Sequence, residues 1–202
     1  MPKILILVSA LFLLTCKNDK VGTVGKIEIT PGISNLYDID TKASRCTWKL
    51  DSQGVYTIVD VPLSSGRFSV LEGVPAAADF VMDFHALSIG NMNPNLAIKK
   101  AQVLKDSAFL SCSMYPVGRG IMTRSEKAGL EQSAEHRIGF DLKIKEMVRP
   151  VQMEADLQIS ENEVRLSGKP AVVNLVEWGI AHHAKASVQL LLVFKRIYPQ
   201  QN

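Results

Sequence analysis

Apolar and polar residues alternate along much of this chain with a period of two. The alternation is clearest over residues 78–86, 138–144 and 151–159, and in the first of these Phe80 and Phe84 share one face. Five further segments show it more weakly: residues 46–50, 54–61, 66–72, 163–168 and 187–196. Successive side chains of a strand point to opposite faces, so the pattern predicts half-buried antiparallel strands. About eight such strands joined by short turns are typical of a β-sandwich or a closed barrel.

One stretch breaks the alternation and is expected to form a single helix over about residues 94–107. Asn93 and Pro94 have the chemistry of a helix cap followed by proline at the first helical position. Ala97 and Ala101 then begin an apolar series with helical spacing. The sequence therefore predicts one helix among strands.

Two segments beyond the helix are expected to lie outside the strands. Gly118, Arg119 and Gly120 predict a turn or bulge, and no Lys-Ser/Thr pair follows them as a phosphate-binding loop would require. Residues 125–135 are polar and are interpreted as a connector.

The composition is that of a globular protein. The chain has 202 residues, of which 47% are hydrophobic and 21% charged, and its formal net charge is +3. These values exclude a disordered or fibrous chain and provide no concentrated basic face for nucleic acid. The length suits one domain, which we assign to residues 36–202, and nothing in it specifies an oligomeric state.

The N-terminus predicts export and attachment to a membrane. A positive start is followed by an apolar run at residues 4–14, too short for the roughly 20 residues of a membrane span, so residues 1–15 are predicted to be a signal peptide. The end of this run resembles a bacterial lipobox, in which Cys16 would be lipidated and residues 16–35 would form a tether. Lys17, rather than Asp, favours the outer membrane facing the periplasm. The alternative is an ordinary secretory signal in which Cys16 is incidental.

A series of short landmarks carries a family resemblance. In chain order they are residues 40–44 leading into Trp48, then 66–73, 83–89, 104–110, 139–151 and 174–180. Together they resemble the YceI-like family of periplasmic, lipocalin-like proteins over residues 36–196. Ala43, Ala108 and Glu146 depart from the family pattern, which makes this chain a divergent member.

The resemblance implies a mainly β fold: an extended antiparallel, lipocalin-like barrel with one helix across an end, which binds a long isoprenoid chain inside. The alternating faces predict which side chains line the interior: Trp48, Phe68, Phe80, Met82, Phe84, Phe140, Leu142, Met153, Leu157, Leu190 and Leu192, with Trp178 closing an end. An uncharged wall of this kind suits a linear hydrocarbon. The same faces would also occur in a barrel that packs its own core.

Two functions of different classes follow. The first is an envelope carrier or store, whose partners are an apolar lipid in the barrel and the membrane that holds the anchor. The second is an interaction or structural lipoprotein with a filled barrel, which binds a partner through loops 90–95 and 124–135. No residue set supports an enzymatic function, and no cofactor other than a bound isoprenoid lipid is expected.

Cysteine and histidine offer little further chemistry. Cys46 and Cys112 could pair as a disulfide or could be two small buried apolar residues. His182 and His183 are adjacent, so on a strand they would point to opposite sides, and no metal site is expected. The histidines of the chain, including His136, are expected on the surface or in loops.

The lipobox hypothesis predicts that Cys16→Ser releases the protein from washed membranes, because several acyl chains on one residue hold a protein at a bilayer at about 0.8 kcal/mol per buried methylene. Cell fractionation followed by immunoblotting measures the outcome. If the Cys16→Ser protein still fractionates with washed membranes like the wild type, the lipobox assignment is wrong.

Overall fold

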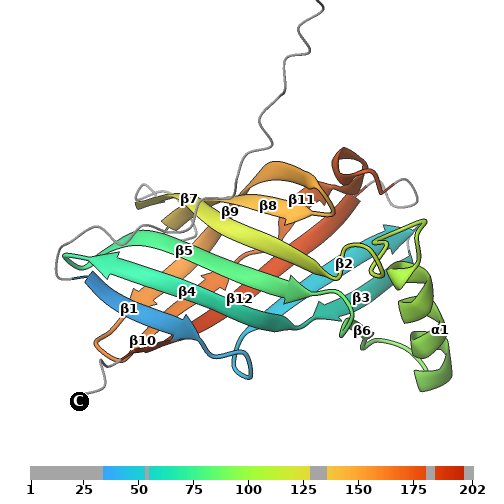
Figure 1. Cartoon of the computed structure of the whole chain (residues 1–202), viewed down its shortest axis with the longest axis horizontal. Coiled ribbons are helices and arrows are strands. Elements are labelled where there is room, and N and C mark those ends of the chain that lie inside the picture. The colour runs from blue at the N-terminus through green and yellow to red at the C-terminus, as the bar shows by residue number, and fades with distance from the viewer. Residues whose placement is uncertain (1–33, 53–54, 128–135, 181–184, 198–202) are drawn as a thin grey trace, which may run out of the picture.

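A computed structural model of the chain describes residues 34–52, 55–127, 136–180 and 185–197 (Figure 1). The signal peptide, Cys16, most of the tether and His182-His183 lie outside these residues. The described elements are β1 (Ser34–Ile39), β2 (Arg45–Ser52), β3 (Val55–Val61), β4 (Leu63–Leu71), β5 (Val74–Asp83), β6 (Ser88–Ile89), α1 (Pro94–Lys105), β7 (Val117–Lys127), β8 (His136–Ile144), β9 (Met147–Ile159), β10 (Glu163–Gly168), β11 (Ala171–Asn174), the 3-10 helix η1 (Leu175–Trp178) and β12 (Lys185–Arg196).

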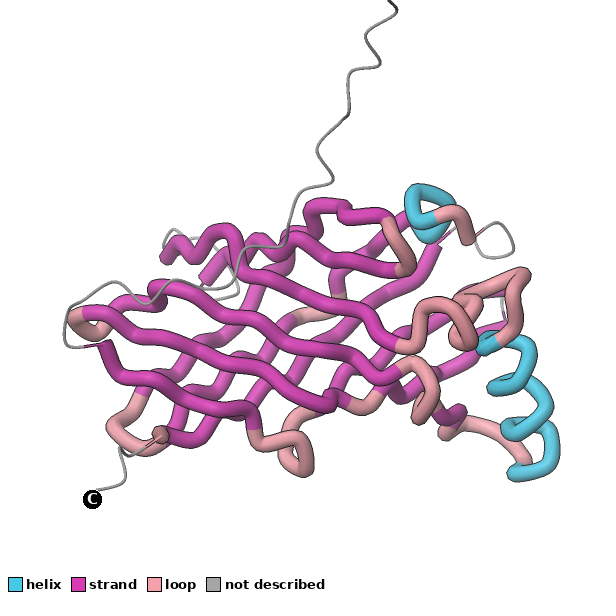
Figure 2. Tube along the Cα trace, in the orientation of Figure 1, coloured by secondary structure: helices cyan, strands magenta, loops and turns pink. Residues whose placement is uncertain are grey.

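The strands form a closed antiparallel barrel of eight strands, which confirms the expected fold class (Figure 2). Around the barrel the order is β1, β4, β5, β7, β8, β9, β10 and β12, and pairing of β12 with β1 closes the circle. Strands β2, β3 and β6 continue the sheet from β12, and β11 also pairs with β12. These additional strands lengthen the sheet beyond the closed part of the barrel.

Strand β12 is shared between two parts of the sheet on each side. On one side, residues 186–191 pair with β2 and residues 194–196 pair with β1. On the other side, β11 pairs with residues 185–188 and β10 with residues 191–195. The long β12 therefore holds together the closed barrel and its extension.

A side chain completes the pairing where β1 and β2 diverge from β12. Val193 lies between the two paired stretches, and its backbone N–H donates to Ser44 Oγ at 2.8 Å. Ser44 Oγ donates in turn to the Val193 carbonyl at 3.2 Å, and this carbonyl also accepts from the Asp40 N–H at 2.7 Å. Ser44 thus satisfies backbone groups that no strand reaches, a structural role for residues 40–44.

Helix α1 confirms the single helix expected over about residues 94–107, and it lies at one end of the barrel, as the family resemblance implies (Figure 1). Asn93 caps it by accepting a hydrogen bond from the Asn95 N–H, and Pro94 is in the first helical turn. Ala101 and Leu104 are buried toward the barrel. The helix ends at Lys105, and its C-cap residue, Asp106, has an extended backbone.

Strand β7 corrects the sequence interpretation. Gly118, Arg119 and Gly120 belong to β7 rather than to a turn or bulge, and residues 125–127 continue this strand instead of a connector. The remainder of the predicted connector, residues 128–135, lies outside the described residues. The inward-facing positions 118 and 120 of β7 are glycines, which have no side chain. The sequence therefore shows no apolar–polar alternation there, and the strand was not predicted. The short strands β1 and β11 were not predicted either.

The two glycines make room for aromatic rings. A Cβ added to Gly120 would lie 2.2 Å from Cζ of Phe80, and one added to Gly118 would lie 2.6 Å from Cζ of Phe84. Both glycines are buried and both rings belong to the interior. The rings therefore cover the inner face of β7 and take the place of its missing side chains.

This packing predicts that Gly120→Ala destabilises the barrel by about 1–3 kcal/mol, because the added methyl forces the Phe80 ring to move. Phe80→Leu removes the ring, so Gly120→Ala should cost less in that background. Denaturant unfolding of the four proteins of the double-mutant cycle measures the coupling.

Gly139→Ala is the matched control on β8, because its nearest neighbour is the exposed Thr123 hydroxyl at 3.1 Å, which can turn away. Equal costs for Gly120→Ala and Gly139→Ala, with no coupling to Phe80, would contradict the ring-over-glycine packing.

Candidate functional site

The barrel interior is the candidate site, and all of the predicted lining residues are buried in it. Each is at most 5% exposed: Trp48, Phe68, Phe80, Met82, Phe84, Phe140, Leu142, Met153, Leu157, Trp178, Leu190 and Leu192. They come from β2, β4, β5, β8, β9, η1 and β12, with Phe84 directly after β5. Their common burial follows from the period-two alternation, and contact with a ligand stays a prediction.

Three aromatic pairs organise the interior. The rings of Phe80 and Phe140 meet edge to face with centroids 5.5 Å apart. Phe80 is the partner of Gly120 in the pairing of β5 with β7, and Phe140 of β8 is the partner of Met122, two residues further along β7. The rings of Phe68 and Phe194 are 5.3 Å apart, and those of Trp48 and Phe84 are 5.8 Å apart. The Phe68–Phe194 rings are tilted by 51°, and the other two pairs are edge to face, an arrangement that contributes about 0.5–1.5 kcal/mol beyond burial of the area.

Trp178 lies beside the end of β8. It is the last residue of η1, which begins after Asn174, whose side chain accepts a hydrogen bond from the Val176 N–H. The indole Nε1 of Trp178 donates to the Leu142 carbonyl at 3.1 Å. Its one polar atom is therefore satisfied while the ring remains buried.

Both described cysteines are free and buried, in agreement with the second alternative for this pair. Trp48 Nε1 donates to Cys46 Sγ at 3.3 Å, and Met82 Sδ lies 3.7 Å from the same sulfur. Burial raises the pKa of the Cys46 thiol to about 12. Burial also raises the pKa of Cys112, whose Sγ is 3.6 Å from the Phe84 carbonyl. Neutral thiols of this kind behave as small apolar groups.

The described interior contains no carboxylate, ammonium or guanidinium group. No Asp, Glu, Lys or Arg is buried there, and the buried polar residues are Ser44, Thr57, Ser111 and His136. A charge in such a place would require a partner to offset its loss of hydration. The described interior is therefore suited to apolar groups alone, apart from isolated polar atoms.

His136 corrects the expectation that the histidines are on the surface or in loops. It is the first residue of β8, is 7% exposed and belongs to the inward row that continues at Ile138 and Phe140. Its Nδ1 has no hydrogen-bond partner within the described part of the chain. Extending the alternation of residues 138–144 by two residues toward the N-terminus would have placed the His136 side chain in the interior. His85, by contrast, is exposed.

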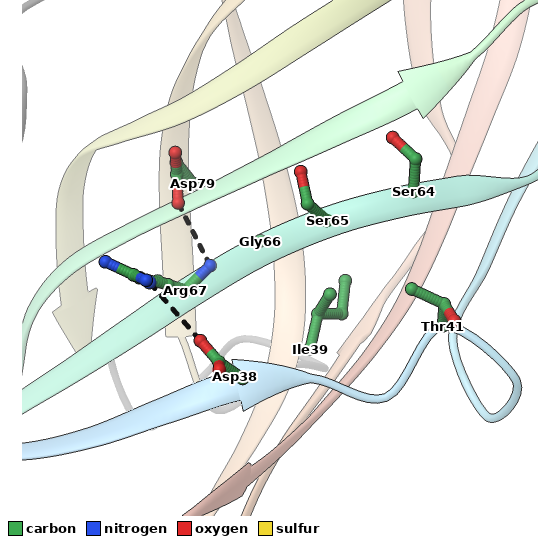
Figure 3. Close-up of a pocket in the computed structure, with 8 residues that line it drawn as sticks. All are labelled: Asp38, Ile39, Thr41, Ser64, Ser65, Gly66, Arg67 and Asp79. Carbon is green, nitrogen blue, oxygen red and sulfur yellow. Dashed lines mark hydrogen bonds and ion pairs between the residues drawn. The ribbon is translucent and has the colours of Figure 1, made fainter. Parts of the chain in front are cut away.

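A polar groove of about 470 Å³ lies on the outer side of the barrel near the end of β1. Figure 3 shows Arg67 between Asp38 and Asp79. Arg67 Nε is 3.3 Å from Asp38, the Arg67 N–H donates to Asp79 Oδ1 at 3.0 Å, and Arg119 pairs with Asp79 at 2.5 Å. The charges of the groove thus offset one another. Exposed ion pairs contribute about 0–1 kcal/mol each to folding stability. The groove is therefore best explained as part of the outer surface of the sheet.

Over the described ranges, no three His, Cys, Asp or Glu side chains come together as metal ligands. None of the helices described is both long enough and apolar enough for a membrane span.

Comparison with known proteins gives matches of structure alone. No protein-family model and no curated protein matches the chain. BcnA of Burkholderia cenocepacia is similar over 77% of this chain and 98% of its own, with a TM-score of 0.61 at 12% identity. A YceI protein of Campylobacter jejuni covers 90% of this chain and 96% of its own, with a TM-score of 0.46 at 11% identity. The likeness to BcnA shows that this chain has a YceI-like fold, the extended barrel that the sequence resemblance implied.

Proposed function

We propose that this protein binds a long apolar lipid, of isoprenoid type, inside its barrel and serves as a carrier or store in the cell envelope. The observation that carries the proposal is the inner wall of Phe, Trp, Met and Leu, in which no Asp, Glu, Lys or Arg is buried over the described residues. Such a wall offers a hydrocarbon the burial that it lacks in water, and no chemical step is needed.

The free energies involved are sufficient for useful binding. Burying one five-carbon isoprene unit provides up to about 4 kcal/mol gross, at roughly 0.8 kcal/mol per carbon group. Micromolar affinity needs about 8 kcal/mol net, after the cost of ordering the chain. Several units in contact with the inner wall would therefore be enough.

Flexible side chains would allow the interior to receive a chain. Met82 and Met153 are buried in the lining, and methionine is unbranched with three rotatable bonds, so it repacks at small cost. A lipid chain that entered the barrel would displace the two methionine side chains more easily than the paired rings of Phe80 and Phe140. We infer that the ligand is slender, because a bulky ring system would have to separate these two rings.

Placement at a membrane would supply the ligand. We propose that the mature chain begins at an acylated Cys16 and faces the periplasm from the outer membrane. The proposal rests on the lipobox-like sequence and on Lys17. A barrel held there lies close to a source of apolar lipid.

The second candidate is an interaction or structural lipoprotein with a filled barrel. The observation in its favour is the close packing of Phe80 and Phe84 over Gly120 and Gly118, which occupies part of the interior with the protein's own rings. In that case a partner would bind on the outer surface, for example along residues 90–93 before α1, and no lipid would enter. Of the two loops expected for this role, residues 94–95 belong to α1, residues 124–127 belong to β7, and residues 128–135 lie outside the described residues.

The lipid-binding proposal predicts that Leu142→Gln weakens uptake of a fluorescent isoprenoid probe at least about tenfold, because the amide would be buried against hydrocarbon without a partner. Leu142 is 4% exposed on the inward row of β8. Lys143→Gln, at the next residue on the outward row, is the matched control and should bind like the wild type.

Circular dichroism establishes that each variant is folded, and Leu142→Met tests tolerance of the position to an apolar change. Wild-type uptake by folded Leu142→Gln would refute the interior as the site. No uptake by any of these proteins, the wild type included, would favour the filled barrel.

A further inference from the structure

Two polar atoms on the inner wall of the barrel have no hydrogen-bond partner within the described part of the chain. They are Nδ1 of His136, at the start of β8, and Oγ of Ser125, near the end of β7. Both atoms are buried, and His136 as a whole is 7% exposed. A buried polar atom without a hydrogen bond costs free energy of folding, so a pair of them in an apolar interior calls for an explanation.

The pairing of β7 with β8 places the two residues on one face and close together. Ser125 is the partner of Ile138, and Lys127 is the partner of His136. Paired residues of antiparallel strands point to the same face, and Ile138 and His136 belong to the buried inward row of β8. Ser125 and His136 are therefore diagonal neighbours, about 7–8 Å apart on the inner wall. An oxygen atom between their side chains would be within reach of both.

We call Ser125 and His136 the polar pair, and the inner wall beside it carries small residues. The partner of His136 on β9 is Ala155, and the partner of Ala155 on β10 is Gly168. Met153 covers Gly168, with its Sδ 2.6 Å from the position of an added Cβ. Methionine is unbranched and repacks at small cost. A ligand group beside His136 would therefore displace a flexible side chain rather than a packed ring.

The polar pair lies at one end of the interior. Strand β7 begins beside α1 and ends at the far end of the barrel, where β8 begins (Figure 1). From His136 toward α1, the inward row of β8 continues with Ile138, Phe140 and Leu142, which are apolar and buried. A lipid whose chain follows this row would meet the polar pair with one end only.

We propose that the polar pair binds the hydroxyl group of a long-chain alcohol whose hydrocarbon lies along the apolar interior. The inference rests on the proposed lipid-binding function and adds to it the polar end and the orientation of the ligand. A hydroxyl group both donates and accepts, so it satisfies Nδ1 of His136 and Oγ of Ser125 in either tautomer of the neutral imidazole. A carbonyl oxygen only accepts, and it would leave an acceptor Nδ1 without a partner.

A phosphate head group fits this place less well. A phosphate monoester carries nearly two negative charges at neutral pH, and burying them without partners costs far more than burying a hydroxyl. No Lys or Arg is buried among the described residues of the inner wall. Lys127 lies opposite His136 on the same face, but its side chain is exposed. The site is therefore suited to an uncharged group.

Displacement of the fluorescent isoprenoid probe tests the proposal. The competitors are geranylgeraniol, the hydrocarbon in which hydrogen replaces its hydroxyl, and geranylgeranyl phosphate. Water hydrates the hydroxyl, so a wall without partners for it should bind the hydrocarbon more tightly than the alcohol. We expect the wild type to bind the alcohol at least as tightly as the hydrocarbon. The ratio of the two affinities should fall about tenfold in His136→Leu and severalfold in Ser125→Ala.

Two further variants separate hydrogen bonding from other effects. His136→Asn keeps a hydrogen-bonding atom near the position of Nδ1 and should retain most of the preference for the alcohol. His85→Leu is the matched control and should bind like the wild type, because His85 is exposed.

Thermal unfolding of the ligand-free protein is an independent readout. The Tm of His136→Leu should equal or exceed that of the wild type, because leucine is similar in size and leaves no polar atom without a partner. A histidine with a purely structural role would give a lower Tm in this variant and an unchanged affinity ratio.

An unchanged ratio in folded His136→Leu and Ser125→Ala would overturn the proposal. Tighter binding of the phosphate than of the alcohol, lost in Lys127→Gln, would overturn it in favour of an anionic head group. In both cases binding of the hydrocarbon shows that the interior still takes up a lipid, so the proposed function stands. Failure of the wild type to bind any of the three competitors would contradict the proposed function and this inference together.

Discussion

The pairing of β12 with four strands is the constraint on which the rest of the structure depends. β1 and β10 bind its C-terminal half and close the barrel, while β2 and β11 bind its N-terminal half and extend it. Where β2 gives way to β1, Ser44 supplies the hydrogen bonds of Val193 that neither strand provides. Closure on this strand makes every strand of the barrel present one face to a common interior, and the alternation of the sequence makes that face apolar.

The character of the interior follows from closure. Burial raises the pKa of the Cys46 thiol, which therefore stays neutral. Trp48 and Trp178 donate their ring N–H groups to a sulfur atom and to a backbone carbonyl. The charged side chains that form ion pairs, such as Arg67 with Asp38, point outward instead. Inner and outer surfaces thus have separate chemistries, the inner one suited to hydrocarbon.

The sequence predicted the fold correctly where the pattern of apolar and polar side chains reveals a strand or a helix. Residues such as Phe140 and Met153 alternate with polar neighbours, so their burial could be predicted, and the Asn93-Pro94 cap located α1. It failed at β7, because Gly118 and Gly120 have no side chains and their place is taken by rings from β5 and the residue after it. It also failed at His136, a polar residue in an apolar row. The polar groove beside β1 depends on elements that only the fold brings together.

The central claim is that the apolar interior holds a lipid in the cell. The most direct measurement is organic extraction of protein purified from its native envelope, followed by mass spectrometry of the extract. If the interior holds a lipid, the extract contains an isoprenoid or similar long apolar molecule in a defined ratio to the wild-type protein, and this molecule is depleted in folded Leu142→Gln. An extract without such a molecule, from protein that also refuses isoprenoid lipids in vitro, would contradict it.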